Sequence, residues 1–335
     1  MNYSGGGAPV AELRASFAAA LRARGVELVG DGELEEFLAR HRIRWTGGIG
    51  SADAAALRSE LAADGALFAS VDVWQPGIAP KVWLTLRLVS AGPLPRVLFI
   101  DARGRSGDDA PGLFALGWVS DVREIQRQSV VGLAASLARF LASGAPRASA
   151  CASAPRFEPH ATFRSPLLDK QKEWTVAVLP FVNETARRNA GEAIALAFLR
   201  QILASPRLRA LEPGIVREQL FQFRITPERG VTLDQARVLL ELLDADLVLV
   251  GSVRELEEGL GERGVPRIQF SAMVLDRENN EIAWDSSSQN AGDDGVIFFD
   301  AGFVSTSGDL GCRMIRAVVD GWLDPGRNTA RNTLR

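Results

Sequence analysis

Hydrophobic residues at every second position mark two matching stretches of the chain. Residues 81–89, KVWLTLRLV, place aliphatic side chains at every second position, and residues 267–275, RIQFSAMVL, follow the same alternation. This is the period of a strand with one buried face. A second strand-like run follows each stretch, at 96–101 and 281–286, so we expect a β-hairpin in both places.

Residues at helical spacing open both halves of the chain. A stripe of this kind predicts an amphipathic helix at the start of each half. The aligned pairs are Val10/Gly191, Leu13/Ile194, Phe17/Phe198 and Leu21/Ile202. Further helix pairs are expected at 33–42 and 214–224, after the caps Ser51 and Thr232, and after Ser120 and Ser305.

An internal repeat connects these elements. Residues 107–120, GDDAPGLFALGWVS, and 292–305, GDDGVIFFDAGFVS, align without a gap, and seven of their positions are identical. Average composition gives about one identity by chance. The correspondence extends to strands at 65–74 and 245–254, and to shorter strands expected at 26–29 and 208–211.

We therefore predict an α/β (α+β) protein of two tandem copies of a mixed-sheet domain, with helices packed on each sheet. The first repeat spans residues 1–142, an Ala-, Pro- and Ser-rich linker spans 143–172, and the second repeat spans 173–323. The polar residues 324–335 are expected to form a flexible tail.

The first repeat lacks one strand that the second repeat has. Residues 173–185, EWTVAVLPFVNET, contain a strand-type run, but the alignment places Met1 opposite Val182 and Asn2 opposite Asn183. Nothing in the chain therefore aligns with the run itself. Either the chain begins late or another segment fills the position, and we favour the late start, with a secretion signal then standing upstream.

Composition and charge restrict the class of partner. The chain of 335 residues has a net charge of −3, which gives no basic footprint for a nucleic acid. No stretch reaches the roughly 18 apolar residues of a membrane-spanning helix. The only cysteines are Cys151 and Cys312, and the only histidines are His41 and His160, so the close spacing of a structural zinc site is absent. We expect no metal and no cofactor.

The recurring acidic pairs suggest turns rather than catalysis. No further titratable residue recurs beside Asp108–Asp109 and Asp293–Asp294 to complete a catalytic constellation, so we expect turn or helix-cap roles. Cys312 is interpreted as a buried or semi-buried thiol, and Gly5–Gly7 as a flexible turn. We predict no catalytic residue and a non-enzymatic protein.

Aromatic residues and glycines give the candidate protein-binding residues. They belong to a predicted hairpin tip and to the repeated aromatic–glycine element, which serves either as a docking patch or, in our preferred interpretation, as a plug over one end of the sheet. The candidates are Trp74, Ile78, Phe114, Gly117, Trp118, Phe299, Gly302 and Phe303.

The motifs of the second half resemble a group of bacterial envelope proteins. VAVLPFVNET at 176–185, LRALEPGIVREQL at 208–220 and LLDADLVLVGSV at 242–253 occur in the order typical of CsgG-like curli secretion channels, the TolB amino-terminal domain and lipoprotein activators of penicillin-binding proteins. The resemblance covers about 173–290 and reaches the first half through the repeat. A pore is not expected, because residues 74–80 and 255–266 are too short for membrane hairpins.

The resemblance implies a non-enzymatic accessory or scaffold protein of a Gram-negative envelope, periplasmic or associated with the outer membrane. It would bind other envelope proteins through strand edges and hairpin tips, with a possible homo-oligomer, in a secretion, surface-structure or wall-synthesis system. The alternative is a cytoplasmic regulatory or ligand-sensing module with TolB-like domains. An enzyme on the same fold would require a cleft with convergent polar residues.

Overall fold

The structure is a computed structural model that describes residues 1–44, 47–109, 117–144, 146–153, 155–170, 172–226, 230–296 and 302–324. In the first half lie α1 (Val10–Arg22), α2 (Asp31–Arg40), α3 (Ser51–Leu61), β1 (Gly65–Gln75), β2 (Lys81–Ser90), β3 (Val97–Ser106) and α4 (Val122–Ser143). The connecting segment carries η2 (Pro155–Phe157), β4 (Ala161–Arg164) and η3 (Pro166–Asp169). In the second half lie β5 (Trp174–Val178), β6 (Val182–Asn183), α5 (Ala190–Ala204), β7 (Leu208–Ala210), α6 (Pro213–Gln222), α7 (Leu233–Leu242), β8 (Leu247–Glu257), β9 (Arg267–Asp276), β10 (Ile282–Ala291) and α8 (Ser307–Leu323).

The strands form two sheets, which confirms the predicted fold class. β1, β2 and β3 make an antiparallel sheet, here called sheet A. Sheet B is mixed and has the order β4-β10-β9-β8-β5-β7, with β6 also paired to β8. The segment assigned to the linker thus supplies β4, which pairs with β10 at the edge of sheet B.

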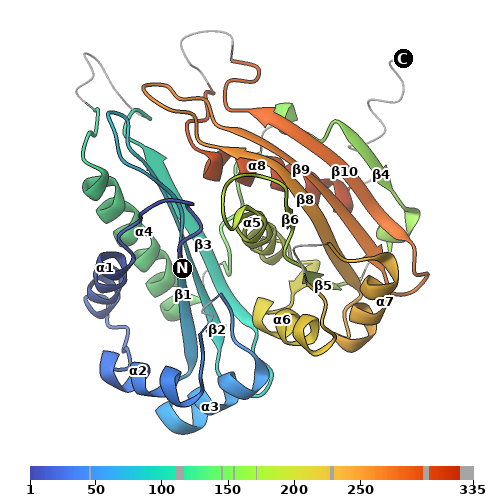
Figure 1. The fold of residues 1–335 in the computed structure, drawn as a ribbon, viewed down its shortest axis with the longest axis horizontal. Helices are drawn as coiled ribbons and strands as arrows, with labels where there is room; N and C mark the ends of the chain where they lie inside the picture. Colours follow the sequence, from blue (N-terminus) through green and yellow to red (C-terminus); the bar gives the residue numbers. More distant parts are fainter. Residues whose placement is uncertain are drawn as a thin grey trace.

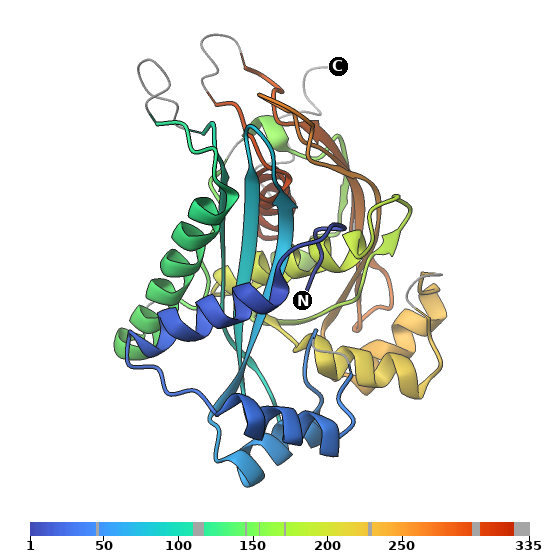
Figure 2. The ribbon, with the colours of Figure 1, turned by 60° about the vertical axis from the view of Figure 1, so that its left-hand side comes forward.

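Helices cover the sheets in alternating layers (Figure 1). α1 and α4 pack on one face of sheet A around Phe17, Leu84 and Leu133. α5 and α8 lie between the two sheets and pack on the inner face of sheet B, as the view in Figure 2 also shows. α2 and α3 cover part of the remaining face of sheet A, and α6 and α7 cover part of the remaining face of sheet B.

The two halves repeat each other down to their irregularities. β1 carries a bulge at Asp72 and β8 carries one at Arg254, while β3 and β10 carry matching bulges at Leu98 and Ala283. A bulge disturbs the ladder at one residue, so it fixes the alignment of two strands.

These bulges correct the alignment of one strand pair. The sequence comparison sets residue 65 against residue 245, but the pairing with β2 and β9 sets Gly65 against Leu247. The gap-free alignment is two residues out because both registers keep hydrophobic residues on the same face. The first-helix stripe is confirmed for Leu13, Phe17 and Leu21, whereas Val10 is exposed.

The chain start occupies the place aligned with β6. Asn2 forms a parallel bridge with Val71, just as Asn183 pairs with Val253. The Asn2 side chain accepts hydrogen bonds from the backbone N–H and the hydroxyl of Ser4, and the Asn183 side chain accepts the same pair from Thr185. The predicted equivalence of Asn2 and Asn183 is thereby confirmed.

One short strand prediction is wrong. Residues 208–210 form β7, which pairs with β5, but residues 26–29 are not in a strand. The reason is the absent neighbour, because β7 gains its hydrogen bonds from β5 and no counterpart of β5 lies beside β1 among the described residues.

A disulfide closes the connection between the halves. Cys151 lies in the connecting segment and is bonded to Cys312 on α8, with a Cα–Cα distance of 5.4 Å. The expectation of a free thiol at Cys312 is therefore wrong. The sequence separation of 161 residues concealed the pair, since only the fold of the connecting segment brings Cys151 to α8.

Candidate functional site between the two halves

The two halves meet where α5 and α8 pack against sheet A. Gly308, in the first turn of α8, lies under the Trp83 ring, and a Cβ atom built at Gly308 would lie 2.2 Å from the Trp83 Cδ2 atom. Small residues such as Ala193, Ala197 and Gly311 continue this contact surface. The absence of large side chains allows the helices to approach the sheet closely.

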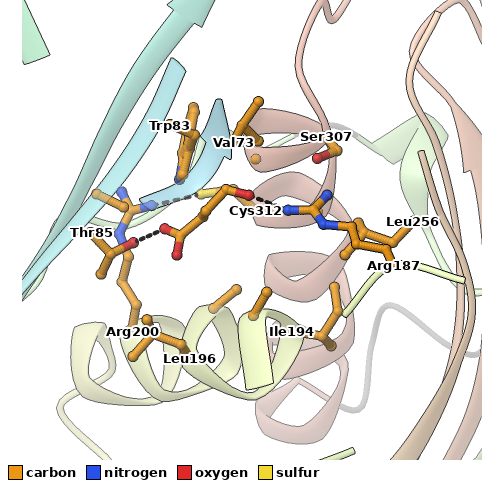
Figure 3. Close-up of a pocket in the computed structure, with 16 residues that line it drawn as sticks. Val73, Trp83, Thr85, Arg187, Ile194, Leu196, Arg200, Leu256, Ser307 and Cys312 are labelled. Carbon is orange, nitrogen blue, oxygen red and sulfur yellow. Dashed lines mark hydrogen bonds between the residues drawn. The ribbon is translucent and has the colours of Figure 1, made fainter. Parts of the chain in front are cut away.

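A small cavity lies in this seam. Its volume is about 50 Å³, enough for a few water molecules and far below the roughly 300–1,000 Å³ of a ligand pocket. Figure 3 shows Thr85 and Trp83 on the sheet side, Arg200 on α5 and Cys312 on α8 around it. Of the polar residues around the cavity, Thr85 donates to the Asp72 carboxylate, and Arg200 donates to Cys312 Sγ and to the Ser149 hydroxyl.

Asp72 is the buried carboxylate of this seam. Its side chain accepts hydrogen bonds from the hydroxyls of Ser70 at 2.7 Å and Thr85 at 2.5 Å. Burial raises the pKa of Asp72, and these hydrogen bonds and the nearby Arg187 oppose that change. The carboxylate is thus held in place but remains costly to ionise.

Arg187 ties the second half to the start of the chain. It precedes α5, and its guanidinium donates to the backbone carbonyls of Tyr3 and Asp72. Burial raises the pKa of the Tyr3 phenol to about 12. Arg187 therefore fixes the N-terminal residues against β1 from the opposite half.

A second charged group lies at the start of α8. The Glu258 carboxylate accepts hydrogen bonds from the backbone N–H and the hydroxyl of Ser307. Lys81 donates to the carbonyls of Glu258 at 2.9 Å and Gly264 at 2.8 Å. Burial raises the pKa of Glu258 and lowers that of Lys81. A negative charge at a helix N-terminus is favourable, so Glu258 joins the hairpin of sheet B to α8.

A third contact joins the opposite end of the seam. Glu212 caps α6 and also accepts a hydrogen bond from the Ile49 N–H at 3.1 Å, while Arg87 of β2 lies 3.5 Å away. Burial raises the pKa of Glu212. A Cβ atom at Gly214 would lie 2.3 Å from Ile49 backbone atoms, so the two halves touch here through the main chain.

These residues lie at the contact between the two halves and are held there by hydrogen bonds. Among the described residues, no group of three or more His, Cys, Asp or Glu side chains is placed to bind a metal ion. Each seam carboxylate instead accepts hydrogen bonds from neighbours across or beside the seam.

Two of the candidate binding residues, Ile78 and Trp118, lie next to each other. Ile78, 66% exposed, lies in the β1–β2 turn, and its carbonyl accepts a hydrogen bond from the Trp118 indole at 2.9 Å. The structure thus brings the hairpin tip and Trp118 together. Trp74 packs partly on the core, Gly117 is exposed, and Gly302 accepts a hydrogen bond from Arg156.

The three remaining candidate binding residues are phenylalanines. Phe303 is half-buried, whereas Phe114 and Phe299 lie outside the described residues. Whether these candidates bind a protein stays a prediction.

The acidic pairs do serve turns. Asp109 accepts a hydrogen bond from the Ser106 N–H, and Asp294 accepts one from the Ala291 N–H, each at the end of the last sheet strand of its half. Asp109 also bonds to Ser305 of the opposite half. One residue of each pair therefore closes a turn, and Asp109 contributes to the seam.

Sequence reasoning missed Arg187, Glu258 and Glu212. A usable signal was present, since the position aligned with Arg187 in the first repeat is Gly6. A charge present in one copy and missing from the other marks a surface at which the copies have different neighbours.

Comparisons with known proteins find similarity of structure only. No protein-family model and no curated protein matches the chain. The PelC dodecamer structure from Paraburkholderia phytofirmans is similar at 17% identity and a TM-score of 0.34, covering 49% of this chain and 95% of that one.

Two further structures are similar. Lipoprotein GNA1162 from Neisseria meningitidis has 18% identity and a TM-score of 0.29, covering 35% of this chain and 78% of that one. The LpoB C-terminal domain from Escherichia coli has 12% identity and a TM-score of 0.26, covering 37% of this chain and 93% of that one. Likenesses of this strength carry no argument about what this chain binds or does.

In the part of the chain that the structure describes, no helix is both long and apolar enough to cross a bilayer.

Proposed function

We propose that this protein is a non-enzymatic accessory or scaffold protein of the bacterial cell envelope. The observation that carries the proposal is the disulfide between Cys151 and Cys312. Disulfides form and persist in oxidising compartments such as the periplasm, and they are rare in the reducing cytoplasm. Together with the envelope-type motifs of the second half, this favours an exported protein over a cytoplasmic regulatory module.

The arrangement of the seam supports a structural role. Glu212 is buried and accepts a hydrogen bond from Ile49 of the other half, whereas the buried Asp72 and the half-buried Glu258 accept hydrogen bonds within their own halves, beside the seam. The cavity beside Asp72 has room for only a few water molecules. A substrate would have to displace contacts that keep the molecule together.

Two neighbouring turns offer a surface for envelope partners. Ile78 is 66% exposed, and Leu260, in the β8–β9 turn, is 89% exposed. The turns are tied together by a hydrogen bond from the Gln75 amide to the Gly259 carbonyl at 3.2 Å. Two exposed aliphatic side chains on linked turns form a small apolar surface of the kind that anchors protein contacts.

Thiol labelling in cells tests the compartment. A maleimide of high mass is added to lysed cells under denaturing conditions, with and without prior reduction. We expect no labelling of the native protein before reduction and two labels afterwards, while Cys151→Ser takes up one label in both conditions. Two free thiols in the unreduced native protein would contradict the proposal.

Site-specific photo-crosslinking tests the partner surface. A photoreactive residue at Ile78 or Leu260 is expected to give adducts with envelope proteins. Leu94 is the matched control, because it is 73% exposed but lies in the β2–β3 turn at the opposite end of sheet A. Equal adducts from all three positions would argue against this surface.

A further inference from the structure

The two cysteines of the disulfide have different surroundings. Cys312 belongs to α8 and lines the small cavity in the seam. Cys151 lies in the connecting segment, outside any helix or strand. Both residues are buried, since Cys151 is 4% exposed and Cys312 is 5% exposed. A thiol reagent therefore reaches this bond only when part of the structure opens.

A buried cation contacts the Cys312 sulfur. Arg200 is 7% exposed, and its Nη1 atom donates a hydrogen bond to Cys312 Sγ at 3.1 Å (Figure 3). Its Nη2 atom donates to the Ser149 hydroxyl at 2.8 Å and lies 3.8 Å from the Asp101 carboxylate, while its Nε atom has no hydrogen-bond partner among the described residues. Burial lowers the pKa of Arg200, and Asp101 opposes that change. The guanidinium thus has little compensating charge, and a negative charge formed on Cys312 would stabilise it.

Cys151 is held in place through its main chain. Its N–H donates to the Gln201 side-chain oxygen at 3.4 Å, and its carbonyl accepts a hydrogen bond from Arg316. Release of Cys151 requires the loss of these few contacts, whereas exposure of Cys312 requires the packed seam to open. The cavity beside Cys312 has room for only a few water molecules, so it admits no thiol reagent of larger size. Cys151 is therefore the sulfur that a reagent reaches first.

We propose that the disulfide is made and broken through a mixed disulfide between Cys151 and a dithiol reagent, with Cys312 as the sulfur that leaves and returns. In thiol–disulfide exchange, the sulfur that forms the more stable thiolate leaves faster, and a neighbouring arginine stabilises a thiolate. Arg200 is thus a positioning residue that sets the direction of the exchange. This reactivity goes beyond the proposed function and does not depend on which proteins the molecule binds.

Reduction of the bond takes two successive attacks. The thiolate of the dithiol attacks Cys151 Sγ, the S–S bond breaks, and its electron pair passes to Cys312 Sγ. The second thiol of the reagent then loses its proton to solvent and attacks the reagent sulfur of the mixed disulfide, which releases Cys151 as a thiolate that takes up a proton. The dithiol is oxidised to a disulfide, and the protein gains two electrons. Formation of the bond reverses these steps: Cys151 attacks an oxidised dithiol, and the Cys312 thiolate then attacks Cys151 Sγ and expels the reagent.

Glutathione, a monothiol, tests the direction because it leaves the exchange at the mixed disulfide. The oxidised full chain is incubated with reduced glutathione, free thiols are blocked by rapid alkylation, and mass spectrometry of the peptides locates the glutathione. We expect about fivefold or more glutathione on Cys151 than on Cys312, with Cys312 alkylated in the same molecules. The same reaction in concentrated urea is the control, because unfolding removes the Arg200 contact and should remove the preference. Equal amounts on the two cysteines of the folded chain, or no adduct on either, would overturn the proposal.

Variants of Arg200 separate its charge from its packing. Arg200→Lys retains the cation and should keep most of the preference for Cys151, whereas Arg200→Met should lower it toward the value in urea. The matched control is Arg313→Met, since Arg313 is the next residue along α8 after Cys312 but is paired with Asp309. If Arg200→Met does not fold, the comparison of the folded native chain with the chain in urea still decides. An unchanged preference in folded Arg200→Met would overturn the role of Arg200.

Discussion

Charged side chains are buried where the two halves meet. Asp72 shows most clearly the energetic cost of burying such a charge. It lies in a bulge of β1, and burial raises its pKa even though Ser70 and Thr85 donate to it. An acid with a raised pKa binds its proton in the folded state at a pH where the unfolded chain has already released it. Its contribution to stability is therefore fully present below about pH 3.8 and is lost as the pH rises through the higher, folded-state pKa.

Asp72→Asn is expected to remove this pH dependence. The variant should resemble the wild type near pH 4 and gain stability relative to it as the pH rises toward 7. Urea unfolding at a series of pH values measures the difference, and Asp64→Asn, at a fully exposed position, is the control. A difference between wild type and Asp72→Asn that does not change with pH would contradict this account.

Gly308 sets how closely α8 approaches sheet A. Because the Trp83 ring occupies the space of a Cβ atom, Gly308→Ala should destabilise the chain by about 1–3 kcal/mol through overpacking. The matched control is Gly32→Ala on α2, where nothing lies within 4 Å of the added carbon. Combining Gly308→Ala with Trp83→Ala should recover part of the loss, and a purely additive double variant would count against the contact.

At the scale of elements, local patterns predicted most of the fold. Alternation in β2 and β9 located the hairpins, and the expected helix cap Thr232 was confirmed, since it forms a capping box with Gln235 at the start of α7. These features depend on neighbours in sequence. Residues 26–29 did not form the expected strand, because a strand needs a paired neighbour and no counterpart of β5 lies beside β1 among the described residues.

The candidate site was harder to predict for the same reason. The roles of Arg187, Glu258 and Cys151 arise from contacts with the other half or with a distant helix. No periodic pattern of hydrophobic and polar residues along the sequence indicates such a contact. The sequence does contain aligned positions at which the two copies have different types of residue. Some of the seam residues lie at these positions.

The connecting segment stabilises the molecule through its disulfide. Cys151→Ser is expected to lower the free energy of unfolding by about 2–4 kcal/mol, because the bond closes a long loop. Denaturant unfolding of the native chain with and without reductant should show the same loss. Reductant should change nothing further in the Cys151→Ser variant, and an unchanged midpoint in the reduced native chain would refute the prediction.

For the whole molecule, the seam joins unlike surfaces. A sheet face of the first copy lies on a helix face of the second copy, so the contact is heterologous. The matching outer positions differ, since Gly308 corresponds to Arg123 on α4 and Trp83 corresponds to Gln269 on β9. A long charged side chain at Arg123 would block the close approach that Gly308 allows.

Self-association through a copy of this seam is therefore not expected. The possible homo-oligomer predicted from the sequence would need a different surface. If sedimentation equilibrium shows that the wild type has the 36.1 kDa mass of one chain, Gly308→Ala should show the same mass. An oligomer of the wild type that dissociates in this variant would show that the seam also operates between chains.

Because a sheet face of the first copy packs on a helix face of the second copy, the two outer sides of the molecule differ. One outer side presents α1 and α4, and the other presents the uncovered part of sheet B, including Ser252 and Ser271, so no rotation exchanges the two ends. A duplicated chain built in this way has two ends that are not equivalent. Whatever attaches at one end meets a chemistry that the other end cannot offer, which suits a part that must be inserted into a larger assembly in one orientation only.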